Sequence, residues 1–232
     1  MPIQQLLIWP GVILLIIILI FRFRKVLKLN LIRLAYGQYS YPYHSTFKKY
    51  FVKSPFQYCF RDDFVAHILY VLSKKEEVPC YKSMKEIHFE NTAYSTKYKD
   101  LLKERGNPDC FNSFYFDQLG FEIKAIGYQS NIAGSKAILV FYFMNDTFFM
   151  GEYIFKNPKT DIKANMVGYF LGNEEMTVDN FYIENTKNRI IHFHNTGFTV
   201  DIKYLNRENQ EIIDHLKQYY NFITGKKLVV EP

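Results

Sequence analysis

The chain has 232 residues, a formal net charge of +6, 22 Phe, 19 Tyr and a single Trp. This length holds one large domain, or a medium domain with an anchor, and the aromatic residues supply enough buried area for a compact core. Part of the positive charge lies beside an apolar segment, and no aromatic-and-basic RNA-binding signature occurs, so a nucleic-acid partner is not expected.

The first residues predict a membrane anchor. The stretch IQQLLIWPGVILLIIILIF, residues 3–21, contains no charged side chain and is long enough to cross a bilayer as a helix. No cation precedes it and no small-residue cleavage site follows it, which favours an uncleaved single-pass anchor over a signal peptide. The alternative interpretation is a buried core helix.

Cations gather directly after this stretch. A one-sided excess of Lys and Arg marks the flank that stays on the cytoplasmic or matrix side, so the soluble part is expected there, at an inner (plasma or mitochondrial) membrane. The segment RFRKVLKLNLIRL is interpreted either as a stop-transfer flank, which we favour, or as an interfacial helix whose cations meet anionic headgroups. The residues expected at the membrane interface are Trp9, Arg22, Arg24, Lys25 and Lys28.

The three cysteines, Cys59, Cys80 and Cys110, are an odd number and form no C-x-x-C pair. This pattern predicts thiols in a reducing compartment rather than a disulfide framework, with a single Cys59–Cys80 bridge left open.

Residues 35–61 show no sustained period and carry Gly and Pro among many aromatic residues, which predicts an irregular connector. Residues 62–77 then predict a short helix. Its apolar stripe consists of Phe64, Ile68, Val71 and Leu72.

Two heptapeptides indicate an internal repeat. KEIHFEN, residues 85–91, and GEYIFKN, residues 151–157, share Glu, Phe and Asn at the same offsets. Each is followed at an equal distance by a glycine, Gly106 or Gly172, that is expected to end a helix.

Each expected helix has a candidate cap, Ser95 in the first copy and Asp161 in the second. Strands separated by turn residues follow each glycine. The expected strands cover residues 114–116, 121–128, 137–145 and 147–155 in the first copy and 181–185, 188–194 and 198–206 in the second, before a C-terminal helix over 207–223.

The sequence thus predicts an α+β fold, in which a single N-terminal transmembrane helix precedes tandem α-β-β-β repeats that form an antiparallel sheet with helices on one face. The expected parts are the anchor with its basic flank (1–28), the connector and short helix (29–85), the first α-β-β-β unit (86–157), and a second α-β-β unit with a C-terminal helix (158–232).

A helix that ends in LLKERGNPD and is followed by strands resembles the small lipoprotein of the outer-membrane β-barrel assembly machinery. Two such units in tandem resemble binding modules of the β-lactamase inhibitor protein type. The resemblance covers the order of elements over residues 86–206 and the Gly-x-Pro of the first copy, and it implies a binding function without catalysis. The chain departs from these proteins because it has no lipobox cysteine and a different predicted orientation.

His192 and His194 lie two residues apart on an expected strand, so both rings should point to one side. With Asp201 on the adjacent strand they form a conceivable Zn²⁺ site, but a solvent-facing or hydrogen-bonded pair is the preferred interpretation. No metal or cofactor is therefore expected. Gly134-Ser135-Lys136 lacks the remaining residues of a phosphate-binding loop and predicts a hairpin turn.

No catalytic nucleophile or carboxylate pair stands out. The first hypothesis is therefore a membrane-anchored, non-enzymatic protein-interaction module, with a variant in which it is an accessory subunit of a bacterial or mitochondrial membrane complex. Its expected partners are a protein at the membrane and the lipid bilayer. The alternative is a membrane-tethered sensor for a small ligand or lipid, and an enzyme acting through His192 and His194 comes third.

Overall fold

The computed structural model describes residues 23–52, 56, 64–73, 77–159, 161–172 and 176–225. The chain divides into two compact units, Met1–Pro55 and Phe56–Pro232. The predicted anchor, with Trp9 and Arg22, lies outside the described residues. No helix among the described residues combines the length and the apolar character needed to cross a bilayer.

The first unit contains a helix over residues 23–36 and helix α2, Tyr41–Phe51. The side chain of Ser40 caps α2 by accepting a hydrogen bond from the Tyr43 N–H, and Val52 ends it in the left-handed conformation. The prediction of an irregular connector over residues 35–61 is therefore wrong for α2. A capping serine followed by a proline in the first turn is a helix start signal that outweighs the Tyr-rich composition.

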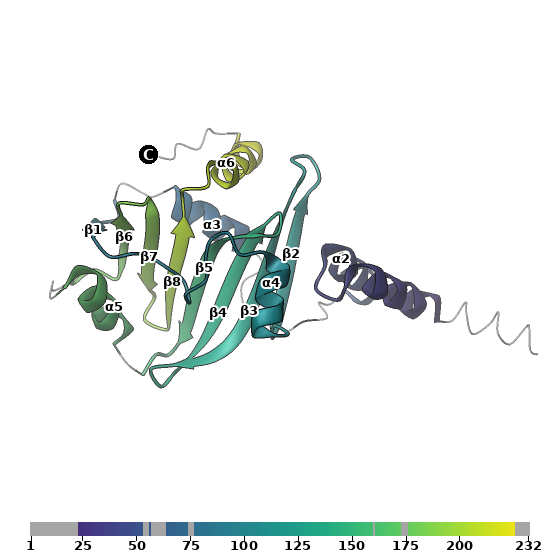
Figure 1. The fold of residues 1–232 in the computed structure, drawn as a ribbon, viewed down its shortest axis with the longest axis horizontal. Helices are drawn as coiled ribbons and strands as arrows, with labels where there is room; N and C mark the ends of the chain where they lie inside the picture. Colours follow the sequence, from purple (N-terminus) through teal and green to yellow (C-terminus); the bar gives the residue numbers. More distant parts are fainter. Residues whose placement is uncertain are drawn as a thin grey trace, which may run out of the picture. The chain divides into compact units, whose positions relative to one another are not determined.

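The second unit is built on one eight-stranded sheet (Figure 1), in the order β1-β6-β7-β8-β5-β4-β3-β2. All neighbours are antiparallel except β1 and β6, which are parallel. The strands are β1 Cys80–Ser83, β2 Cys110–Phe116, β3 Phe121–Ile132, β4 Ser135–Met144, β5 Thr147–Lys156, β6 Asn180–Asn185, β7 Arg189–Asn195 and β8 Thr199–Asn206, and the helices are α3 Phe64–Leu72, α4 Tyr98–Arg105, α5 Ile162–Leu171 and α6 Gln210–Thr224.

The α+β class and the expected strands are confirmed. Helices α4 and α5 end at Gly106 and Gly172, both with positive φ, as the heptapeptide alignment predicted. Asp161 caps α5 by accepting a hydrogen bond from the Ala164 N–H. The N-cap position of α4 is held by Lys97 and not by Ser95, and the Lys97 side chain makes no capping hydrogen bond. Whether the two halves are copies of one unit stays a prediction.

Strand β1 was not expected, and it makes the sheet mixed rather than antiparallel. It has only four residues, and its pattern of exposed and buried side chains does not alternate cleanly. Its position is set by the partner strand β6, because a segment this short carries little periodic signal of its own.

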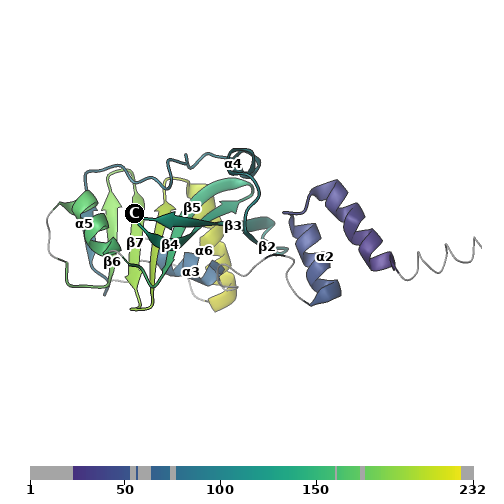
Figure 2. The same cartoon turned by 90° about the horizontal axis from the view of Figure 1, so that it is seen from below.

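Helices and connecting segments cover both faces of the sheet (Figure 2), so the prediction of helices on one face is wrong. Helices α3 and α6 contribute to a buried core on one face, and α4 with the segment before it lies on the other. The reason is visible in β4, where residues 139–144 are all buried. A strand with apolar residues on both sides requires cover on both sides.

Residues 85–97, here called the strap, cross the face opposite α3 and α6 (Figure 2). KEIHFEN is therefore part of the strap, whereas GEYIFKN begins inside β5. Phe89 of the strap is fully buried, with its ring centroid 4.7 Å from that of Tyr153 and 4.9 Å from that of Phe141. The ring lies directly on Gly151, where a Cβ would be 2.1 Å from Cδ1 of Phe89. The two similar heptapeptides thus contact each other in structurally different roles.

Replacing Gly151 with Ala should lower the free energy of unfolding by about 3 kcal/mol, because the added methyl group forces the buried Phe89 ring to move. Chemical denaturation of the purified variant measures this loss.

Gly168→Ala is the matched control, because Gly168 lies within α5 and a Cβ there meets nothing within 4 Å. It should leave stability unchanged or raise it by up to about 1 kcal/mol. In a Phe89→Ala background, Gly151→Ala should cost much less. An equal loss with and without the Phe89 ring would contradict the contact.

Candidate functional site

One row of directly paired residues crosses the whole sheet from β1 to β2. Directly paired residues point their side chains to the same face, and Tyr182 and Val140 of this row belong to the core that α3 and α6 cover. Four consecutive members are polar, in a face that is otherwise largely apolar, and we call them the polar row: Tyr182, His192, Lys203 and Glu152. The complete row runs Cys80, Tyr182, His192, Lys203, Glu152, Val140, Gly127 and Cys110.

The centre of the polar row is a buried ion pair. Lys203 Nζ lies 2.9 Å from Glu152 Oε1, and the two side chains are only 3% and 7% exposed. The hydroxyl of Tyr142 donates a hydrogen bond to the other oxygen, Glu152 Oε2, at 2.5 Å. Burial raises the pKa of Tyr142 well above its usual value, and the neighbouring Glu152 carboxylate raises it further. Both carboxylate oxygens of Glu152 are therefore engaged, one by the Lys203 ammonium group and the other by the Tyr142 hydroxyl.

The next member, His192, is held among rings and an amide. Its Nε2 lies 2.8 Å from Asn180 Oδ1, and its ring stacks on Tyr182 with centroids 4.7 Å apart. Tyr70 of α3 packs over it at 5.5 Å. These contacts place a buried imidazole between the sheet and α3.

The predicted orientation of the two histidines is confirmed. The rings of His192 and His194 are nearly parallel, with centroids 6.1 Å apart, and His194 is paired directly with Asp201 of β8. Among the described residues, however, no group of three or more His, Cys, Asp or Glu side chains is placed to hold a metal ion.

A second buried carboxylate, Glu184, lies at the β1 end of the sheet. It accepts a hydrogen bond from Lys82 Nζ at 2.8 Å and lies 3.8 Å from Arg207 Nη1. The hydrogen bond to Glu184 is the main reason that the pKa of Lys82 is raised. Cys80 Sγ, at the end of the row, donates to the same carboxylate at 3.8 Å.

At the opposite end, Cys110 is disulfide-bonded, so the prediction of thiols is wrong for this residue. Its bonding partner is not among the described residues. Gly127 makes room for the sulfur, because a Cβ there would lie 3.0 Å from Cys110 Sγ. Disulfides persist in oxidising compartments, whereas the sequence predicted a reducing one.

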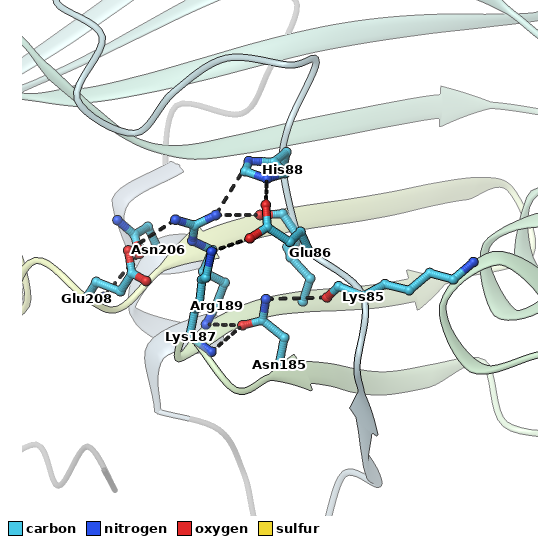
Figure 3. Close-up of polar contacts among 9 residues, drawn as sticks. Lys85, Glu86, His88, Asn185, Lys187, Arg189, Asn206 and Glu208 are labelled. Carbon is cyan, nitrogen blue, oxygen red and sulfur yellow. Dashed lines mark hydrogen bonds and ion pairs between the residues drawn. The ribbon is translucent and has the colours of Figure 1, made fainter.

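On the other face, a cluster of polar side chains fastens the strap to the sheet (Figure 3). Arg189 is its centre, and its guanidinium donates to the Ile87 carbonyl at 3.3 Å and to Glu208 Oε2 at 3.2 Å. It also lies 5.2 Å from the ring centroid of Tyr94 in the strap. The strap cluster consists of Lys85, Glu86 and His88 from the strap, Asn185, Arg189 and Asn206 from the sheet, Lys187 from the β6–β7 turn and Glu208 from the segment after β8.

The carboxylate of Glu86, in the strap, has a lowered pKa. Hydrogen bonds from Lys187 and then from His88 lower its pKa to about 2. A few residues later, Glu90 accepts a hydrogen bond from the Tyr153 hydroxyl at 2.6 Å and lies 3.4 Å from Arg105 Nη2. The strap is therefore fixed by an apolar anchor at Phe89 with ionic contacts on both sides of it.

The sequence did not single out Glu152, Lys203 or Arg189. The available signal was a charged residue on an otherwise apolar strand, in GEYIF and VDIKYL. The remaining expected membrane-interface residues, Arg24, Lys25 and Lys28, are exposed on the helix over residues 23–36 in the first unit. No protein-family model, no curated protein and no solved structure matches this chain.

Lys203→Met should lower the free energy of unfolding by about 3–5 kcal/mol, because it leaves the buried Glu152 carboxylate without its cation. The double variant Glu152→Gln/Lys203→Met should recover most of this loss, since the neutral amide still accepts from Tyr142. Denaturation curves of the wild type, the single variants Lys203→Met and Glu152→Gln, and the double variant complete the double-mutant cycle.

Lys82→Met is the matched control, because the Lys82–Glu184 pair has a similar length but Lys82 is 77% exposed. It should cost less than about 1 kcal/mol. A Lys203→Met loss as small as this one would contradict the buried-pair interpretation.

Acid should weaken the strap cluster. The pKa of Glu86 in the folded chain, about 2, is below its ordinary value of 4.5, so its contribution is complete above 4.5 and is lost as the pH falls from 4.5 towards 2. The difference in unfolding free energy between the wild type and Glu86→Gln, measured across this range, should shrink on acidification. A difference independent of pH would show that Glu86 does not titrate through these contacts.

Proposed function

We propose that the chain is a membrane-anchored, non-enzymatic protein-interaction module. The buried ionisable groups support a structural role over catalysis, since Glu152 and Glu184 are each engaged by neighbouring donors and cations. The observation that carries the binding function is an apolar corner of the second unit, where β1 leads into the strap beside α5.

This α5 corner consists of residues 83–85 with Tyr169 and Phe170. Met84 is 92% exposed and Tyr169 is 58% exposed. The backbone beneath them is fixed, because Ser83 Oγ donates to the Phe170 carbonyl at 2.8 Å and accepts from the Lys85 N–H at 3.2 Å. Met and Tyr are enriched in the cores of protein interfaces, and a fixed backbone lowers the entropic cost of binding.

The charges around Met84 favour an acidic partner surface. Lys85 directly follows Met84 in the chain and is exposed. Lys85 Nζ lies 4.0 Å from the ring centroid of Tyr169, which keeps a positive charge directly beside the apolar contact area. The proposed occupant is therefore a protein surface with an apolar pocket for Met84 and carboxylates at its rim.

The alternative, a sensor with a ligand pocket between the sheet and the helices, has less support. The face beneath α3 and α6 is occupied by buried side chains from both layers, among them Ile68 and Leu216 of the helices and Val140 of the sheet. A binding surface on the outside of this domain requires no space in that core.

The membrane tether in this proposal is residues 3–21, whose uncharged length suits a bilayer. The disulfide at Cys110 favours an oxidising side for the domain, opposite to the side that the cations after residue 21 predict. Protease protection of the domain in sealed membranes decides between the two sides.

Met84→Asp/Tyr169→Ala should reduce recovery of the bound partner at least about tenfold when the full chain is purified by affinity from its native membrane. Stability should change by less than about 0.5 kcal/mol per site, because both side chains are exposed.

Phe198→Asp is the control, since Phe198 is also a highly exposed aromatic side chain but lies in the β7–β8 turn. A protein that binds the proposed surface should be recovered with the wild type and with Phe198→Asp, but not with Met84→Asp/Tyr169→Ala. Identical sets of retained proteins for all three chains would contradict the proposed surface.

A further inference from the structure

The helix over residues 23–36 exposes an apolar stripe along most of its length. Phe23, Leu27, Leu31 and Leu34 follow one another at intervals of four, four and three residues, which places them on one face of the helix. Val26 borders the same face. The five side chains are between 47% and 83% exposed.

The opposite face of this helix is partly covered. Leu29 is buried and Ile32 is half-buried. Lys25, on the same side, places its Nζ 5.8 Å from the ring centroid of Tyr50 in α2. The exposed stripe therefore faces away from the contact with α2.

Cations border the exposed stripe on both sides. Arg24 and Lys28 each follow a stripe residue and lie four residues apart, along one border. Arg33 lies seven residues after Val26, along the other border, and all three are exposed. An apolar face with cations on both borders is the pattern of a helix that lies in the interface of an anionic bilayer.

We propose that the helix over residues 23–36 lies on the surface of an anionic membrane, with its apolar stripe in the acyl boundary and Arg24, Lys28 and Arg33 at lipid phosphates and carboxylates. The inference rests on the membrane-anchor part of the proposed function. A stop-transfer flank, the interpretation that the sequence favoured, needs the cations but not an apolar stripe that continues to Leu34.

Two features favour a bilayer over a second copy or another protein. The uncharged stretch over residues 3–21 ends two residues before Phe23, so a chain tethered through it holds this helix at the membrane surface. The cations on both borders match headgroup charge and would repel the same borders of a second copy.

The test places a single tryptophan in the stripe of the full-length chain. A Trp9→Phe/Leu27→Trp variant is reconstituted into vesicles of phosphatidylcholine with phosphatidylserine, and fluorescence quenching by lipids brominated near the headgroup is measured. Trp9→Phe/Lys25→Trp, on the face that packs against α2, is the matched control. Quenching of the tryptophan at position 27 should exceed that of the control about threefold.

The charge dependence is tested in the same assay. Adding Arg24→Gln/Lys28→Gln/Arg33→Gln to the position 27 variant should lower its quenching to the value in pure phosphatidylcholine, as should high salt. All three substituted side chains are exposed, so folding is not expected to suffer.

Each outcome is decisive. If the protein binds vesicles but the tryptophans at positions 27 and 25 are quenched equally, the proposed surface helix is wrong while the proposed anchor still stands. A blue-shifted tryptophan at position 27 without lipid quenching indicates contact with protein and also overturns it. Protein that does not associate with vesicles overturns both the anchor and this inference.

Discussion

The pairing of β5 with β8 joins the two halves of the described sheet, with β2–β5 on one side of it and β1 with β6–β8 on the other. Two consecutive residues of β5 secure it from opposite faces. Glu152 forms the buried ion pair with Lys203 directly across the seam. Gly151 carries no side chain and so admits the ring of Phe89 from the strap. A buried ion pair tolerates few geometries, which suits a contact that sets strand register.

The covering of both sheet faces follows from this arrangement. The strands are buried on two sides, and the chain supplies α3 and α6 for one side and the strap with α4 for the other. A strap has no helix or strand of its own to satisfy its polar groups. Arg189 satisfies one of these groups by donating a hydrogen bond to the Ile87 carbonyl of the strap, and Lys187 forms an ion pair with the strap carboxylate Glu86. Polar contacts between the strap and the sheet therefore help to close the fold, whereas Met84 and Tyr169 of the α5 corner keep exposed apolar side chains at the surface.

Much of the fold was predictable from particular residues. Asn145-Asp146 forms the expected turn, with both residues at positive φ, and Gly106 and Gly172 end their helices. These are local signals, in which one residue type favours one backbone conformation. The candidate sites were less accessible, because Glu152 and Lys203 are more than forty residues apart and nothing local marks them as partners. The match between the two heptapeptides correctly predicted that Gly106 and Gly172 end helices. It did not predict that KEIHFEN lies in the strap whereas GEYIFKN begins inside β5.

The sequence by itself determined the class of the fold, the positions of nearly all strands and helices in the second unit, the shared side of His192 and His194, and an uncharged segment long enough for a bilayer. These depend on periodicity, turn residues and length, which are properties of short stretches. Only the tertiary structure decided that the strap crosses the sheet, that β1 pairs in parallel with β6, that Cys110 is disulfide-bonded and that Lys203 neutralises Glu152. Each of these joins residues distant in the chain, and such contacts are selected by the packing of the whole domain.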